Sequence, residues 1–405
     1  MRSLYMKKKI FYIGQSYPYP PDSGGRIKAL NTLLSLAKEY EVFAVFVSEE
    51  RQKKGSDNIF RAHGIRTKVY YRPQILAPVY HSMSRMLSNY IRGVPHVAYK
   101  YYSQEIDADV QRLIRLYDPD IVHVCHIGMT EYVRKRDIDK TYVLELENVE
   151  TQLQWSRVLS TRAIFRRAYL LIEGIVSYLY EKRWYQTYDH VFAICNEDAQ
   201  ILRRYFRCPR VSVQSPVMRA RNIPKNGWHP PSLLFVGTLG WPPNEDAIIW
   251  FIRDILPEIK RMIPEVELHV VGRSREFITR ALNLPGIVYH GVCTDIDPFM
   301  AQADVFVLPF RIGGGVKMKA LTAFSSGIPV VSTPIGVRGY DVLDNKHCFI
   351  VSAPDLFAVR VVQLIRDRQL SMRMSRAAKA YITHAHGSKS NTKFLQEYRR
   401  VVNRV

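Results

Sequence analysis

The sequence predicts an α/β protein of two Rossmann-like, doubly wound domains that face each other across a cleft. In both halves of the chain, short apolar runs alternate with segments of helical apolar spacing, which is typical of parallel sheets covered by helices. Residues 219–231 are rich in proline, glycine and asparagine and are expected to form a linker. The first domain is therefore predicted at residues 1–218 and the second at 232–386. Residues 387–405 are expected to form a helix that packs back on the first domain.

The expected strands are short apolar runs, because strands of a parallel sheet are buried on both faces. In the first domain they lie at residues 10–13, 42–47, 67–71, 121–124, 142–146 and 191–194. In the second they lie at residues 232–236, 267–271, 288–289, 305–308, 329–332 and 348–351. Ligands of such sheets bind at the carboxyl ends of the strands.

Helical spacing connects these strands, at residues 28–39, 110–116, 245–255, 277–282, 298–302, 316–326 and 356–367. Asn244 is expected to cap the first helix of the second domain. Asp297 precedes Pro298 and is expected to be a helix N-cap, which explains the sequence "DID" better than a metal site does. Gly327 suits the C-terminus of the helix before it.

The chain carries a net charge of +21, and the charge is patterned. No Asp or Glu lies between Asp57 and Glu105, where seven Lys or Arg occur, and a second acid-free stretch runs from Asp198 to Glu245. Such a field attracts nucleic acid, anionic lipid or anionic substrates, although a basic surface can also serve solubility alone. The sequence lacks helix-turn-helix, zinc-finger and RNA-binding signatures, which argues against nucleic acid.

Other features of the composition favour a cytoplasmic protein. No apolar run reaches the roughly 18 residues of a membrane span, and the apolar stretch that ends at Gly14 is too short for a signal peptide. The five cysteines are odd in number and lack zinc-binding spacing, so reduced thiols are expected.

The stretch "VLPFRIGGGVKMKALTAFSSGIPVVSTP" is the strongest indication of a binding site. A buried strand leads into Gly313, Gly314 and Gly315, and a helix follows. Free backbone N–H groups and a helix N-terminus favour an anion at such a loop. The nearby cations are Arg311, Lys317 and Lys319. They could neutralise a diphosphate, which backbone amides alone cannot do.

Two other strands of the second domain end in glycine before a polar or basic residue, at Gly237–Thr238 and Gly272–Arg273, and a third ends at Gly291. These positions are plausible neighbours of a phosphate, and they are also ordinary strand-to-helix turns.

The order of these motifs resembles retaining glycosyltransferases of family 4. "LLFVGTLGWPPNEDAIIWF", "VVGR", "YHGV" and the triglycine stretch follow one another as in the donor domain of that family. "YPYPPDSGGRIKALNTLLSLAKEYEV" looks like its opening. The resemblance spans nearly the whole chain. It implies the GT-B fold and sugar transfer from a nucleotide-diphosphate sugar, with retention of anomeric configuration and without a metal or other cofactor.

The resemblance also implies roles for individual residues. The catalytic candidates are Arg311, Lys317, Lys319 and His126. The donor-binding candidates are Gly24, Gly25, Gly237, Thr238, Arg273, Gly291, Gly313, Gly314, Gly315, Val316 and Thr322. The leaving phosphate would help to deprotonate the acceptor, because no carboxylate nucleophile is evident.

Two positions depart from the family pattern. Thr322 stands where the family has a glutamate that holds the ribose hydroxyls, and Glu147 stands where relatives often have a histidine. Either His123 or His126 could contact the donor sugar as a family histidine does, and either could equally be a structural histidine.

The acceptor is expected to meet the first domain. Residues 70–102 interleave tyrosines and other apolar residues with basic ones, as an interfacial helix does. The candidates for contact with an acceptor or an anionic membrane are Arg72, Arg85, Met86, Arg92 and Lys100. Alternatively, the apolar residues belong to the core and the arginines are solvated. Membrane contact would imply a lipid-linked saccharide acceptor in polysaccharide or cell-envelope assembly, on the inner face of the plasma membrane.

Two rival functions share this fold. A nucleotide-sugar 2-epimerase would need acidic residues in a first domain that is poor in them. A non-catalytic binding or scaffold protein with a degenerate donor site would explain Thr322 and Glu147, but it would have no need of the basic glycine loop.

Overall fold

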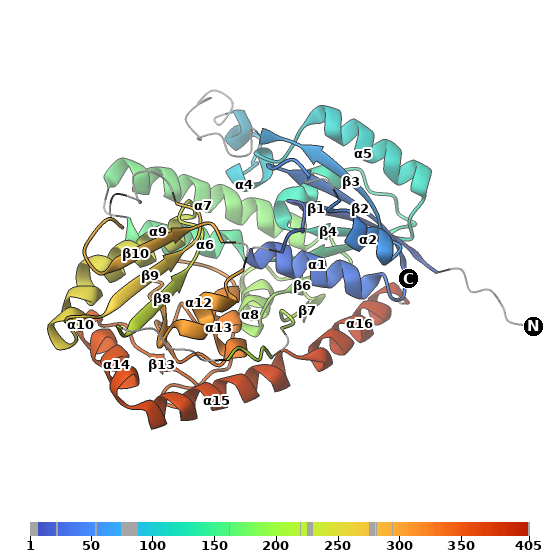
Figure 1. Ribbon diagram of the computed structural model, residues 1–405. Coiled ribbons are helices and arrows are strands. Elements are labelled where there is room, and N and C mark those ends of the chain that lie inside the picture. Colours follow the sequence, from blue (N-terminus) through green and yellow to red (C-terminus); the bar gives the residue numbers. More distant parts are fainter. Residues whose placement is uncertain are drawn as a thin grey trace, which may run out of the picture. The chain divides into compact units, whose positions relative to one another are not determined.

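A computed structural model describes residues 7–21, 23–52, 55–73, 88–161, 163–218, 220–224, 230–274, 280, 282–293 and 295–403. The chain divides into two compact units (Figure 1). The first comprises Met1–Ser215 together with Asn391–Val405, and the second comprises Pro216–Ser390. Each unit is an α/β sandwich around one parallel sheet, as the sequence predicts. Among the described residues, no helix combines the length and apolar character that crossing a membrane requires.

The first unit contains a seven-stranded parallel sheet in the order β3-β2-β1-β4-β5-β6-β7. Its strands are β1 (Lys9–Gln15), β2 (Glu41–Ser48), β3 (Arg66–Tyr71), β4 (Ile121–Cys125), β5 (Thr141–Glu145), β6 (His190–Ala193) and β7 (Val211–Val213). The central strands are buried because helices cover both faces. These helices are α1 (Gly24–Leu36), α2 (Asn58–Ala62), α4 (His96–Tyr99), α5 (Gln104–Tyr117), the 3-10 helix η3 (Ile127–Val133), α6 (Glu150–Ser160), α7 (Ile164–Tyr185) and α8 (Asn196–Tyr205).

The second unit contains a six-stranded parallel sheet in the order β10-β9-β8-β11-β12-β13. Its strands are β8 (Ser232–Val236), β9 (Glu267–Val271), β10 (Ile287–Gly291), β11 (Val305–Leu308), β12 (Val330–Ser332) and β13 (Phe349–Ile350). Its helices are α9 (Pro242–Trp250), the π-helix η4 (Phe251–Ile255), α10 (Leu256–Met262), α12 (Asp297–Gln302), α13 (Met318–Ser326), α14 (Pro354–Arg366) and α15 (Arg368–Ala385).

Most of the expected strands lie within a residue or two of their observed positions, but two expected helix caps are wrong. Helix α9 begins at Pro242, so Asn244 lies inside it, where its Nδ2 donates to Thr238 O at 2.7 Å. Helix α12 begins at Asp297, after Ile296. The Asp297 carboxylate pairs instead with Arg221 at 2.5 Å. The helix expected at 277–282 falls largely outside the described residues.

The helix α16 (Ser388–Val402) supplies part of the core of the first unit. Phe394 and Tyr398 are buried, and both rings contact Phe192 on β6. The Tyr398 hydroxyl also lies 3.1 Å from His123 Nδ1. Residues distant in sequence therefore complete one hydrophobic core.

Phe394→Ala should destabilise the first unit by about 3 kcal/mol, because it removes a buried ring and leaves a cavity. Urea unfolding of the full chain measures the change. Lys393→Ala is the matched control, because Lys393 is exposed on the same helix. Equal unfolding midpoints for the two variants would show that α16 does not stabilise this core.

Candidate functional site

In the second unit, the strand order brings two loops together. In the sheet, β9 and β10 lie on one side of β8, and β11, β12 and β13 lie on its other side. The order therefore reverses between β8 and β11, and ligands of open parallel sheets bind where it does. The loop after β8 contains Gly237 and Thr238, and the loop after β11 contains Gly313, Gly314 and Gly315.

The triglycine loop is shaped by its glycines. Gly313 has φ 148° and Gly315 has φ 57°, which L-residues with a side chain rarely adopt. A Cβ on Gly313 would also lie 2.7 Å from Lys317 Nζ. That amine donates to Gly314 O at 2.8 Å, and Tyr340 OH donates to Lys317 O at 3.2 Å. The loop is thus folded back on its own lysine at the start of α13.

Lys317 and Lys319 lie near the same aromatic ring. Their Nζ atoms are 6.0 and 5.9 Å from the centroid of the buried Phe310 ring. A Cβ on Gly237 would lie 3.2 Å from Lys319 Cε, so Lys319 reaches the loop after β8. The structure therefore brings Gly237, Lys317 and Lys319 together from both sides of the reversal in strand order.

Burial lowers the pKa of Lys319 to about 8. The charged ammonium is disfavoured because its surroundings replace water without supplying a carboxylate. A bound diphosphate would reverse this effect, because two negative phosphates favour the protonated amine.

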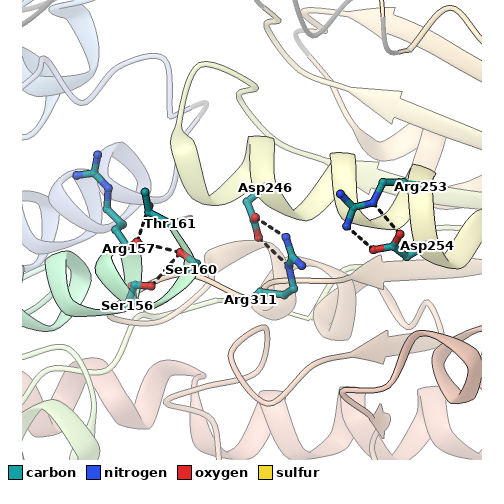
Figure 2. A network of polar contacts seen from close by, with 8 residues as sticks. All are labelled: Ser156, Arg157, Ser160, Thr161, Asp246, Arg253, Asp254 and Arg311. Carbon is teal, nitrogen blue, oxygen red and sulfur yellow. Dashed lines mark hydrogen bonds and ion pairs between the residues drawn. The ribbon is translucent and has the colours of Figure 1, made fainter. Parts of the chain in front are cut away.

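Arg311 has a different position from the two lysines. Its Nε and Nη2 atoms donate to the carboxylate of Asp246 on α9 at 3.1 and 2.6 Å (Figure 2). Its guanidinium also lies over the Trp250 ring. Asp246 already compensates the charge of Arg311, so Arg311 is a weaker candidate than the lysines for binding phosphate. Asp246 lies within the quoted stretch "LLFVGTLGWPPNEDAIIWF", but the sequence did not indicate it as a site residue.

The remaining donor-binding candidates in this unit occupy three positions. Gly272 and Arg273 follow β9, and Leu239 N donates to Arg273 O at 2.6 Å, which ties this loop to the one after β8. Gly291 ends the edge strand β10, two strands away from β8. Val316 precedes the first turn of α13.

Thr322 lies in α13 and is buried. Its hydroxyl donates to Met318 O of the same helix at 3.0 Å. The threonine side chain thus satisfies its own helix backbone, which differs from the charged acceptor that the family has at this position.

In the first unit, the strand order reverses between β1 and β4. Gly24 and Gly25 begin α1 after β1, and His126 follows β4. The carboxylate of Glu147 lies against the first turn of α1. A Cβ on Gly25 would meet Glu147 Oε1 at 2.8 Å, and Gln15 Nε2 donates to Glu147 Oε2 at 3.3 Å. An internal carboxylate therefore lies at the helix N-terminus where the resemblance implies a diphosphate.

His123 is a core residue. It is fully buried, and its Nε2 lies 3.0 Å from Glu145 Oε2. Lys28 Nζ lies 2.6 Å from the other oxygen of the same carboxylate. Burial raises the pKa of Glu145, but Lys28 and His123 outweigh it and bring the pKa to about 2. All three side chains are occupied with one another, so His123 has a structural role.

His126 shapes the loop after β4. Its backbone has φ 80°, and its Nδ1 accepts from Gly128 N at 3.1 Å. Its Nε2 lies 3.3 Å from Glu150 Oε1. Burial alone would raise the pKa of Glu150. Its hydrogen bond with His126 opposes burial most strongly, and the pKa is lowered on balance.

The candidates for acceptor or membrane contact differ in their surroundings. Arg72 Nη1 donates to Tyr101 O at 3.0 Å and also to Tyr102 O, so it holds the backbone of the segment. Lys100 lies over the Tyr101 ring, and burial lowers its pKa. Arg92 is exposed. Arg85 and Met86 lie outside the described residues.

Comparison with known proteins relates one segment of the chain to a known family. The sequence model of the family described as "Glycosyl transferases group 1" matches residues 230–367, which contain both loops and both lysines. The matched residues lie within the second unit. An uncharacterised 44.6 kDa protein in the cps region of Klebsiella pneumoniae is 23% identical over 376 residues, which cover 89% of this chain and 91% of that protein.

A second relative matches a shorter stretch. It is a GDP-mannose-dependent α-(1-6)-phosphatidylinositol monomannoside mannosyltransferase of Mycolicibacterium smegmatis. It is 31% identical over 118 residues, which cover 26% of this chain and 31% of the relative.

Solved structures share the fold of this chain. Sucrose-phosphate synthase of Thermosynechococcus elongatus is similar with a TM-score of 0.75 and 14% identity, over 98% of this chain and all of that one. TarM of S. aureus, in complex with UDP, has a TM-score of 0.69 and 13% identity, over 98% of this chain and 100% of TarM. HepE of Anabaena, also bound to UDP, has a TM-score of 0.63 and 13% identity, over 97% of this chain and 100% of HepE. At these identities the likeness shows the fold alone, and it is the GT-B fold.

The affinity for a nucleoside diphosphate bound at this loop should fall as pH rises above about 8, by up to about tenfold per pH unit, because a protonated Lys319 attracts the diphosphate and a neutral one does not. Below that pH, ionisation of Lys319 should add no pH dependence. Calorimetric titration between about pH 7 and about pH 9 measures the change. Lys319→Arg is the matched control and should show a flatter profile, because a guanidinium stays charged throughout. Equal profiles for the two proteins would exclude Lys319 as the titrating group.

Thr322→Val should change the affinity for a bound nucleoside diphosphate by less than about threefold, because the hydroxyl already serves the helix backbone. Calorimetry at neutral pH is the measurement, and unfolding temperatures of both proteins control for stability. A loss above about tenfold would show that the hydroxyl contacts the nucleotide instead.

Proposed function

We propose that this protein transfers a sugar, with retention of anomeric configuration, from a nucleotide-diphosphate donor to a saccharide or lipid-linked acceptor. One observation carries the proposal. Lys317 and Lys319 lie around Phe310 at the reversal of strand order, inside the segment that matches the group 1 glycosyltransferases. A basic pair beside a glycine loop suits a group that develops negative charge.

The chemistry assigns different tasks to these residues. As the anomeric bond breaks, negative charge grows on the leaving diphosphate. Lys319 would stabilise that charge from a partly desolvated position, where electrostatic attraction is stronger than in water. Lys317 and the backbone of Gly313–Gly315 would hold the phosphates in place, without a metal. In the retaining route the leaving phosphate accepts the proton of the acceptor hydroxyl.

The relatives support the class of donor and the setting. HepE has been crystallised with UDP and UDP-glucose, and TarM with UDP and α-GlcNAc-glycerol. The mycobacterial relative uses GDP-mannose and a phosphatidylinositol mannoside, which supports a lipid-linked acceptor. The Klebsiella relative belongs to the cps region. A role in polysaccharide or cell-envelope synthesis, in the cytoplasm on the inner face of the membrane, agrees with all of these.

Calorimetric titration of the full chain with UDP, GDP and ADP in the presence of EDTA tests the donor site. One nucleotide should bind, and Lys317→Ala should weaken its binding by about tenfold or more, because a charge-assisted contact to phosphate is lost. Lys346→Ala is the matched control, since Lys346 is exposed elsewhere in the same unit.

Two outcomes would contradict the proposal. Binding that depends on added divalent metal would exclude a metal-independent site. If no nucleotide binds at about millimolar concentration, the non-catalytic scaffold function would replace the transferase, and Glu147 and Thr322 would then mark a lost donor site.

A further inference from the structure

Exposed apolar side chains gather on helices α6 and α7 of the first unit. Trp155 and Leu159 are exposed one helical turn apart on α6. On α7 the exposed apolar residues recur at spacings of three and four, which places them along one side of the helix. They are Phe165, Ala168, Ile172, Ile175 and Leu179. These seven residues and Ile164 are called the α6–α7 face below.

The two helices form one hairpin. Among the helix pairs of the described chain, α6 and α7 have the most extensive contact. At Gly174 a Cβ would lie 3.7 Å from Gln154 Cβ and 3.9 Å from Trp155 Cε2, so the helices approach closely there. Trp155 on α6 therefore lies beside the middle of α7, next to its exposed row.

The tip of the hairpin is unusually exposed for its composition. Leu159, Ile164 and Phe165 are 80%, 75% and 89% exposed. The last turn of α6 is nevertheless well held, because Ser160 Oγ donates to Ser156 O at 3.0 Å and Thr161 Oγ1 donates to Arg157 O at 2.7 Å (Figure 2). A fixed apolar tip of this kind is typical of a surface that contacts another phase or partner.

The charge around the face has one sign. Arg166 and Arg167 are exposed at the start of α7, and Lys182 and Arg183 at its end. The two helices contain three glutamates, and all of them are buried: Glu150, Glu173 and Glu181. The exposed charges of α6 and α7 are therefore all positive.

One of these buried glutamates connects the face to the segment that the sequence singled out. Glu173 Oε1 accepts from His96 N at 2.8 Å, and its other oxygen accepts from Tyr90 OH. Ile91, which is 80% exposed, and the exposed Arg92 follow Tyr90 directly. The same combination of apolar and basic side chains thus continues beside α7.

We propose that the α6–α7 face docks the protein on an anionic lipid bilayer. Apolar side chains of the hairpin enter the boundary between headgroups and acyl chains, and the arginines and lysines contact lipid phosphates. A soluble polyanion would bind the basic side chains but leave the apolar rows exposed to water. Pairing with a second copy would bury the apolar rows, but it would bring together α7 helices whose exposed charges are all positive.

This inference deepens the proposed function, because a lipid-linked acceptor requires the enzyme at a membrane. Vesicle binding and nucleotide binding are separate measurements, however. UDP can bind a protein that fails to bind vesicles, and the reverse also holds, so failure of one proposal is distinguishable from failure of the other.

Vesicle flotation of the full chain tests the proposal. Wild-type protein should float with phosphatidylcholine vesicles that contain about 30% phosphatidylglycerol, and less with phosphatidylcholine alone. Phe165→Ser/Ile172→Ser/Ile175→Ser should lower the partition coefficient at least about tenfold, since three apolar side chains no longer enter the bilayer. Arg166→Gln/Arg167→Gln should also weaken binding, but only to the anionic vesicles.

Leu116→Ser/Ile138→Ser is the matched control, because these side chains are 72% and 95% exposed in the same unit but lie outside the hairpin. It should bind vesicles like the wild type. The unfolding temperature and UDP affinity of every variant should be unchanged.

Three results would overturn the proposal. The wild type could fail to float with anionic vesicles. The triple variant could float as well as the control does. Light scattering could also reveal a wild-type dimer that the triple variant converts to a monomer, in which case the face is an interface between copies.

Discussion

The reversal of strand order in each sheet is the constraint on which the candidate sites depend. In the first unit it lies between β1 and β4, and in the second between β8 and β11. Where neighbouring strands lead their connections to opposite faces, the loops between them separate and leave backbone amides uncovered. Gly24 and Gly25 lie at the first reversal and Gly313 to Gly315 at the second. Their importance therefore comes from topology.

The two units treat negative charge at these positions in opposite ways. In the second, Lys317 and Lys319 lie beside the glycine loop, and burial lowers the pKa of Lys319 with no opposing carboxylate among the described residues. In the first, Glu147 already lies against Gly25. The nearby carboxylate of Glu145 is paired with Lys28 and His123. The charges thus favour an anion at the second reversal, whereas at the first an anion would have to displace Glu147 or share its position.

Much of the fold could be predicted from the sequence because buried parallel strands are short, apolar and bounded by glycine or polar residues. The helix ends were harder to predict. Asn244 and Asp297 look like caps, but α9 begins at Pro242, before Asn244, and α12 begins at Asp297 itself, with Pro298 in its first turn. Helices α7 and α15 were not expected. In α7, apolar residues on the exposed side as well as the buried side obscure the helical period. For the site, the glycines and lysines were recognisable from their order. The pairing of Arg311 with Asp246 was not, because it joins residues 65 positions apart that no motif relates.

The place of α16 has a consequence for how the protein is made. Phe394 and Tyr398 complete the core of the first unit, but they are synthesised after the whole of the second. On the ribosome, the second unit has all its residues before the first does. The unit that emerges first is therefore completed last, and until then its apolar surface around Phe192 stays open to chaperones or to aggregation.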